Sequence, residues 1–162
     1  MHIRFRTALT VLMAFTLASS AWAQLTPKKA LNLEVAKQIA AAAEKEAAAN
    51  KWTMVIAILD DGGHLIYLER MDETQIGSVQ VAQDKAASAV SFKRPTKAFE
   101  DMVAGGRTAI LKLPGAIPVE GGVPLMADGK IIGAIGCSGG TSAQDGQVAK
   151  AGVDALAKIL GH

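Results

Sequence analysis

Two short turn signals, each lying between apolar runs typical of strands, constrain the fold of this chain more than any other feature. The first is Asp-Asp-Gly-Gly at positions 60–63, between the runs at residues 52–59 and 64–70. The second is Asp-Gly at positions 128–129, between residues 119–127 and 130–138. Turns of this composition adopt the positive φ angles that join neighbouring antiparallel strands. The sequence therefore predicts two β-hairpins and a mostly antiparallel sheet.

Apolar residues recur at helical spacing in four other segments. We expect one helix to run from about residue 26, with Thr26 as its cap and Pro27 in its first turn, to residue 49. Three more are expected over residues 75–92, 96–104 and 142–160, whereas the proline-containing stretch at residues 107–118 is expected to be irregular. Helices around antiparallel hairpins are typical of an α+β domain.

The start of the chain has the pattern of a secretory signal peptide. Two arginines precede an apolar run at residues 8–18, and an A-x-A cleavage site follows at positions 21–23. The run is too short to span a bilayer comfortably. We therefore expect a signal peptide at residues 1–23 and a single domain at residues 24–162, periplasmic or secreted, with no membrane insertion after cleavage.

The charge of the mature chain excludes one class of partner. The whole chain carries 17 basic and 15 acidic residues, a formal charge of +2. Arg4 and Arg6 leave with the signal peptide, so 15 basic residues remain against 15 acidic ones. A neutral domain has no bulk charge with which to bind nucleic acid, and we expect no nucleic-acid partner.

A single cysteine, Cys137, lies in the last apolar run. One cysteine cannot form an intramolecular disulfide, so the domain depends on its own core or on contacts within an oligomer. A buried small hydrophobic residue is the favoured interpretation of Cys137. A reactive thiol or a metal ligand is the alternative.

The glycine-rich segment Gly-Cys-Ser-Gly-Gly-Thr-Ser at positions 136–142 joins the last predicted strand to the last predicted helix. Glycines let a backbone approach a ligand closely, and the helix that follows presents free N–H groups. The segment predicts a pocket for a carboxylate or phosphate formed by Gly139, Gly140, Thr141 and Ser142. A tight turn that merely caps the helix is an equally good interpretation, with Asp145 complementing the helix dipole.

His64 is the single interior histidine of the mature chain. One histidine suffices as an axial ligand of haem iron, and it can also act as a lone general acid or base. A polar residue at the mouth of a hairpin turn is the simplest interpretation. Arg70 can hold a ligand carboxylate, but with Glu69, Asp72 and Lys85 it can equally form an ion-pair cluster.

Three spaced segments resemble one known family, in order along the chain. They are Leu-Asp-Asp-Gly-Gly-His-Leu-Ile-Tyr-Leu-Glu-Arg-Met-Asp at positions 59–72, the stretch at positions 82–96, and positions 120–152 with the glycine-rich loop. Together they resemble the GlcG/HbpS family of haem-binding-type domains over nearly the whole mature chain. The resemblance implies a profilin- or roadblock-like fold: a five-stranded antiparallel sheet flanked by helices, in the order helix, two strands, two helices, three strands, helix. It also implies a homo-oligomer, a dimer or larger.

The same resemblance implies an exported small-ligand-binding protein whose ligand is haem or a related anionic tetrapyrrole. It places His64 as the axial ligand of the haem iron, and Arg70 and Lys85 near the propionates. Gly139, Gly140, Thr141, Ser142 and Asp145 match the family's loop-to-helix motif. The alternative is an enzyme or an accessory protein acting on a small carboxylate or quinone-like metabolite, with His64 or Asp145 as proton carrier.

Overall fold

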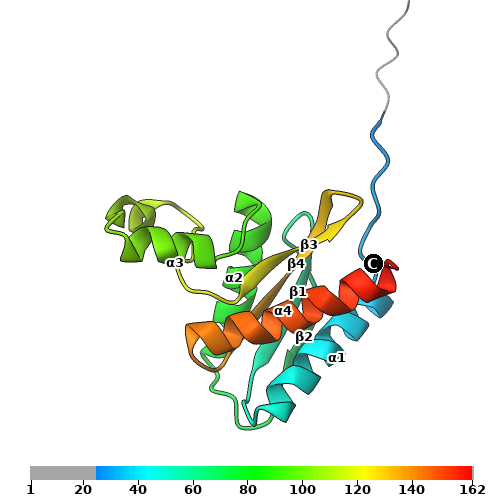
Figure 1. The fold of residues 1–162 in the computed structure, drawn as a ribbon, viewed down its shortest axis with the longest axis horizontal. Coiled ribbons are helices and arrows are strands. Elements are labelled where there is room, and N and C mark those ends of the chain that lie inside the picture. Colours follow the sequence, from blue (N-terminus) through cyan, green and yellow to red (C-terminus); the bar gives the residue numbers. More distant parts are fainter. Residues whose placement is uncertain (1–24, 162) are drawn as a thin grey trace, which may run out of the picture.

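The computed structural model describes residues 25–161, and these form four α-helices, one 3₁₀ helix and four strands. The strands make one antiparallel sheet with the spatial order β2-β1-β4-β3 (Figure 1). In chain order the elements are α1 (Leu33–Ala49), β1 (Val55–Asp60), β2 (Leu65–Arg70), α2 (Ser78–Phe92), α3 (Lys97–Ala104), η1 (Thr108–Lys112), β3 (Gly122–Ala127), β4 (Lys130–Ser138) and α4 (Ser142–Ile159).

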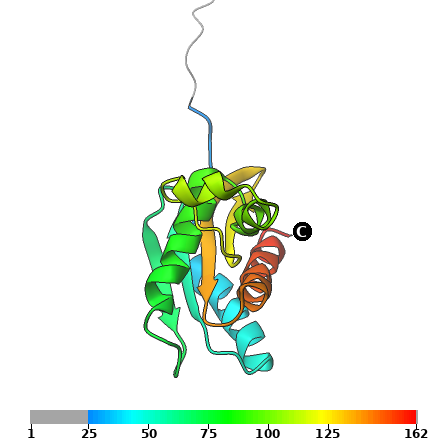
Figure 2. The same ribbon diagram turned by 90° about the vertical axis from the view of Figure 1, so that its left-hand side faces the viewer.

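Helices cover both faces of the sheet, with α2 on one face and the pair α1 and α4 on the other (Figure 2). The side chains of β1 alternate between the two layers. Ile56 and Ile58 belong to the core beneath α1 and α4, whereas Val55, Ala57 and Leu59 belong to the core beneath α2. Because β1 is buried on both faces, its sequence is continuously apolar instead of alternating with polar residues.

The α2 layer lies very close to the sheet. A Cβ atom at Gly136 would lie 2.0 Å from the carbonyl oxygen of Ala82, and one at Gly122 would lie 2.2 Å from the carbonyl oxygen of Lys85. The facing positions of α2 include Ala82 and Ala86, both fully buried. Glycine on the sheet and alanine on the helix therefore set the spacing, which leaves little room for large rings in this layer.

Both predicted hairpins are confirmed. The tip of the β3–β4 hairpin has positive φ angles at Asp128 (49°) and Gly129 (72°), as a tight two-residue turn requires. The predicted last helix is also confirmed, because α4 begins with a reciprocal capping box between Thr141 and Gln144. Asp128 and Gly129 thus mark the boundary between β3 and β4, and Thr141 marks the start of α4.

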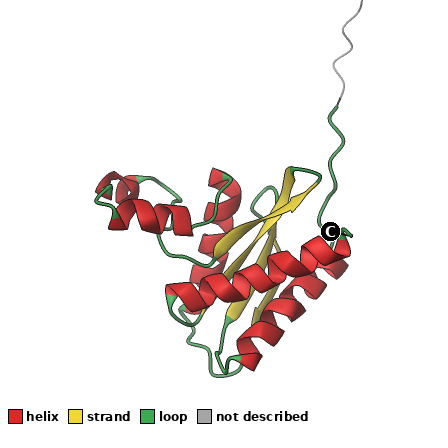
Figure 3. Cartoon of the chain, viewed as in Figure 1, coloured by secondary structure: helices red, strands yellow, loops and turns green. Residues whose placement is uncertain are grey.

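The fifth strand is a wrong prediction, since residues 107–121 contribute no strand to the described sheet. Thr108–Lys112 forms η1 instead, and loop continues from there to β3 (Figure 3). Pro114 and Pro118 have no N–H group to donate to a neighbouring strand. The α+β class is confirmed with four strands, and the profilin- or roadblock-like classification stays a prediction.

The predicted start of the first helix is also wrong. α1 begins directly after Asn32, whose side chain accepts a hydrogen bond of 2.9 Å from the N–H of Val35. Residues 25–32 precede it without helical structure, and the carbonyl of Pro27 accepts a hydrogen bond from a lysine of β4. Asn32 thus supplies the cap that the sequence analysis assigned to Thr26, because the earlier segment is held against the sheet.

The predicted signal peptide at residues 1–23 lies outside the described residues, so that boundary stays a prediction. Within residues 25–161, no helix combines the length and the apolar character needed to cross a membrane.

Substituting Gly136 by alanine tests the close approach of α2 to β4. The added methyl group meets the backbone of Ala82, which cannot move without shifting α2, so we expect the free energy of unfolding to fall by about 1–3 kcal/mol or more. Gly77→Ala is the matched control, because a Cβ at Gly77 meets nothing within 4 Å. Denaturant unfolding measures both, and equal stability of the two variants would contradict the packing described.

Candidate functional site

His64 lies at the turn between β1 and β2, and it is the one histidine among the described residues. Its side chain is 83% exposed, and its Nδ1 lies 3.3 Å from Oδ1 of Asp60. The same oxygen accepts hydrogen bonds from the backbone N–H groups of Gly62 (2.8 Å) and His64 (2.9 Å). Asp60 therefore organises the turn and orients the imidazole.

The Asp60 carboxylate is held in its ionised form. The N–H of His64 lowers the pKa of Asp60 below its ordinary value, and the N–H of Gly62 adds to this effect against a smaller opposing effect of burial. A carboxylate beside Nδ1 favours the tautomer in which Nδ1 carries the proton. In that tautomer Nε2 carries the lone pair, on a side chain that is 83% exposed.

The glycine-rich loop lies over a buried ion pair. Lys85 of α2 and Asp145 of α4 meet with Nζ and Oδ2 2.6 Å apart, and their side chains are only 1% and 3% exposed. Lys85 also donates to the carbonyl of Cys137 at 3.1 Å, and the N–H of Gly140 donates to the other oxygen of Asp145 at 3.0 Å. The loop was predicted to bind the carboxylate of a ligand, and the carboxylate bonded to it here is that of Asp145.

Burial raises the pKa of the Asp145 carboxyl above its ordinary value, and the Lys85 ammonium and the N–H groups of Gly140 and Gly139 oppose that rise. A charge pair removed from water is stable only while each charge keeps its partners. The pair therefore holds α2, β4 and α4 in one arrangement around the loop.

Thr141 and Ser142 complete the turn into α4. The N–H of Thr141 donates to Oε1 of Gln144 at 2.9 Å, and the N–H of Gln144 donates back to the Thr141 hydroxyl at 3.4 Å. The helix-capping interpretation of this segment matches the observed bonds. The ligand-binding assignment of Gly139, Gly140, Thr141 and Ser142 stays a prediction.

Arg70 and His64 lie at opposite ends of the sheet. Arg70 pairs with Val55, which in turn pairs with Ser138 beside the glycine-rich loop. At the other end of β1, Asp60 pairs with Gly133. Five residue steps of about 3.3 Å separate these ends, a distance of about 17 Å. The structure thus brings Arg70, Lys85 and the loop to one end of a single chain and places His64 at the other.

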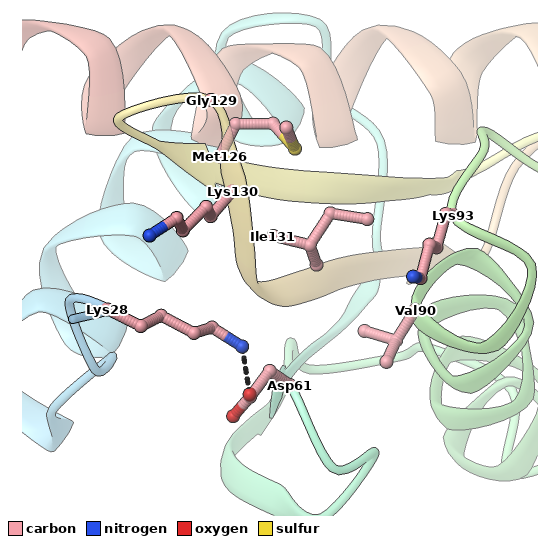
Figure 4. Close-up of a pocket in the computed structure, with 8 residues that line it drawn as sticks. All are labelled: Lys28, Asp61, Val90, Lys93, Met126, Gly129, Lys130 and Ile131. Carbon is pink, nitrogen blue, oxygen red and sulfur yellow. Dashed lines mark hydrogen bonds and ion pairs between the residues drawn. The ribbon is translucent and has the colours of Figure 1, made fainter. Parts of the chain in front are cut away.

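A cleft of about 550 Å³ lies at the His64 end, between α2 and the β3–β4 hairpin (Figure 4). Three lysines from distant parts of the sequence line it, Lys28, Lys93 and Lys130, together with Asp61 of the β1–β2 turn. None of these lysines was predicted as a site residue, because surface lysines near turns and helix ends are usually solvated. The sequence gives only a weak sign of the cleft: Lys93 directly follows the predicted helix at residues 75–92, and Lys130 directly follows the predicted turn at residues 128–129.

The comparisons with known proteins cover most of the described domain. The family described as "Haem degrading protein HbpS-like" matches residues 31–154. The chain belongs to the HbpS-like family. Protein GlcG of Escherichia coli (strain K12) is 48% identical over 111 residues, which span 68% of this chain and 83% of that protein.

Solved structures of HbpS-like relatives have the same fold. A double mutant of Streptomyces reticuli HbpS superimposes with a TM-score of 0.73 at 32% identity, covering 85% of this chain and 92% of that one. A PduOC–haem complex superimposes with a TM-score of 0.71 at 30% identity, covering 78% and 95%. The predicted GlcG/HbpS resemblance is therefore confirmed.

No group of three or more His, Cys, Asp or Glu side chains among residues 25–161 is arranged to hold a metal ion.

Lys85→Met tests the buried ion pair. The substitution leaves the Asp145 carboxylate buried without its cation, so we expect the free energy of unfolding to fall by about 3–5 kcal/mol. Combining it with Asp145→Asn removes that unpaired charge and is expected to restore at least half of the loss. Lys150→Met, which breaks an exposed pair with Asp154, is the control and costs about 0.5 kcal/mol or less. The free energy of unfolding of each variant is measured with denaturant. An equally small loss for Lys85→Met and Lys150→Met would contradict the stabilising role of the buried pair.

Cys137 is expected to be chemically inert in the folded protein. Complete burial, aided by the nearby Asp145 carboxylate, raises the pKa of its thiol well above the ordinary value, and the thiolate is the reactive form. Iodoacetamide at pH 8 should therefore leave the native chain unlabelled and label it fully in guanidinium chloride, as judged by mass spectrometry. Native labelling at the denatured rate would show that the thiol is accessible.

Proposed function

We propose that this chain is an exported binding protein for haem or a related anionic tetrapyrrole, with His64 as the axial ligand of the iron. One observation carries the proposal: the His64 imidazole is 83% exposed, and its Nδ1 faces the ionised Asp60 carboxylate. Metal-binding histidines commonly donate their second ring N–H to such a carboxylate, which orients the ring and makes the other nitrogen a better ligand. Nε2 is then the atom that would contact iron.

The relatives support this choice of ligand. The family description names haem-degrading proteins, and the PduOC domain has been crystallised with haem. Both statements concern those proteins, and they favour a tetrapyrrole over other small anions for this chain. Haem would supply the iron and a large apolar ring, while the chain would supply an imidazole, apolar contacts and cations for the propionates.

Export and assembly are further parts of the proposal. The basic start, the apolar run and the A-x-A site within residues 1–23 favour secretion to the periplasm or beyond. The resemblance to the GlcG/HbpS family favours a homo-oligomer of two or more copies.

Binding is a better fit than catalysis on a small carboxylate or quinone-like metabolite. In that alternative His64 or Asp145 carries a proton. Asp145 is enclosed beneath the loop and bonded to Lys85, which separates it from any substrate in solution. His64 stands on an exposed turn, where Asp60 is the one acidic partner it has among residues 25–161.

Titration of haemin into the mature protein tests the axial role of His64. The wild-type chain should give a saturable Soret shift, and His64→Ala should weaken binding at least about tenfold and change the shift, because the axial nitrogen is lost. The exposed His64 side chain makes this variant a mild one for folding. His162→Ala removes the other histidine of the mature chain and is the matched control. A Soret shift that His64→Ala leaves unchanged rejects the assignment.

A further inference from the structure

The cleft at the His64 end is walled by three segments that are far apart in sequence. α2 contributes its C-terminal end, the β3–β4 hairpin contributes one side, and the segment before α1 contributes Lys28 (Figure 4). Three contacts tie that segment to the sheet: ion pairs from Lys28 to Asp61 and from Lys29 to Asp128, and a hydrogen bond of 2.5 Å from Lys130 to the carbonyl of Pro27. The segment before α1 therefore closes one side of the cleft.

The cleft carries an excess of positive charge. Lys28, Lys93 and Lys130 line it against the single carboxylate of Asp61. Lys28 is paired with Asp61, whereas Lys93 and Lys130 have no acidic partner among residues 25–161. An ammonium group has three N–H donors, so both lysines retain donors for a bound anion. In a mature chain with no net charge, this is a local concentration of cations.

The space between the lysines is apolar. Val90 of α2 and Ile131 of β4 form the centre of the cleft, and Figure 4 shows Ile131 between Lys130 and Lys93. Met126 lies on the rim and is 44% exposed, with a side chain that adapts readily to a ligand surface. Apolar walls with a few placed charges, in a volume of about 300–1,000 Å³, are typical of sites for organic ligands.

The cleft and His64 share one end of the sheet. Asp61 lines the cleft and lies in the same four-residue turn that precedes His64. Arg70 and the glycine-rich loop lie at the far end of β1, about 17 Å away, and Lys85 is enclosed. His64 does not itself line the cleft, but the cleft lysines lie at the same end of the sheet as His64, whereas the predicted propionate partners Arg70 and Lys85 do not.

We infer that Lys93 and Lys130 hold the carboxylate groups of an amphipathic anionic ligand whose apolar body lies on Val90, Met126 and Ile131. The identity of that ligand as a tetrapyrrole rests on the proposed function. The cleft itself does not need iron, since its contacts are an apolar surface and two ammonium groups.

Protoporphyrin IX, the metal-free dicarboxylate, separates this inference from axial ligation. We expect it to bind the full mature chain saturably, with its fluorescence as the readout, and the double variant Lys93→Gln, Lys130→Gln to weaken that binding at least about tenfold. The dimethyl ester, which lacks the charges, should bind wild type and double variant alike. Raising the salt concentration should weaken only the dicarboxylate.

Two controls accompany that experiment. Lys97→Gln with Lys150→Gln removes two exposed lysines that are paired with Asp101 and Asp154, and should change the affinity less than about twofold. Haemin titration of His64→Ala is the second control, because haemin alone carries the iron that His64 would contact. Loss of haemin coordination in His64→Ala, together with loss of porphyrin affinity in the Lys93→Gln, Lys130→Gln variant, supports both proposals at once.

Three results would overturn the inference. One is the absence of saturable binding of the metal-free porphyrin to the wild-type chain, whether or not haemin binds. Another is equal affinity of the Lys93→Gln, Lys130→Gln variant. The third is a Lys93→Gln, Lys130→Gln variant whose weaker binding is fully explained by a lower melting temperature. Lys93 would then only complement the C-terminal dipole of α2. If His64→Ala binds haemin as wild type does, while the Lys93→Gln, Lys130→Gln variant binds protoporphyrin IX more weakly, the axial role of His64 is rejected and the cleft assignment stands.

Discussion

The buried ion pair between Lys85 and Asp145 is the interaction on which the rest of this structure depends. It joins α2 to α4 across the end of β4, and the same two charges bond the carbonyl of Cys137 and the N–H of Gly140. A Cβ at Gly121 would lie 2.9 Å from the Lys85 ammonium and 2.6 Å from the Cys137 carbonyl oxygen, so the chain passes this point only as glycine. Charges buried this completely tolerate no alternative arrangement, because each would otherwise lose its partner in a medium that solvates it poorly.

This pair also decides what the glycine-rich loop can do. A loop of free N–H groups at a helix start attracts an anion, and here Asp145 supplies one from the helix itself. The N–H of Gly140 in this loop is therefore already bonded to a carboxylate of the protein. The opposite end has the contrasting properties: an exposed imidazole oriented by Asp60, and a cleft whose lysines outnumber its carboxylates. One end of the sheet thus holds a buried ion pair, and the other end presents an exposed imidazole and a cleft.

Much of the fold could be predicted from local chemistry. Asp128 and Gly129 specify a tight turn whatever surrounds them, and Thr141 with Gln144 specifies a helix start. One prediction failed where the local signal was real but a competing contact was stronger. Thr26 and Pro27 suit a helix start, yet Asn32 caps α1 because the preceding segment bonds to β4. The fifth strand came from the resemblance alone, and prolines in residues 107–121 remove the donors it would need.

The sequence by itself determined the α+β class, both hairpins, the start of α4 and the membership of the HbpS-like family, since these depend on residues adjacent in the chain or on ordered motifs. It also singled out His64, Arg70, Lys85 and Asp145 as residues of interest. Only the tertiary structure decided how these group in space: Lys85 with Asp145 in the interior, Arg70 at one end of the sheet, and His64 at the other end, where the lysine-lined cleft also lies. The physical reason is that strand register and helix docking set these distances, and both arise from contacts between residues far apart in sequence.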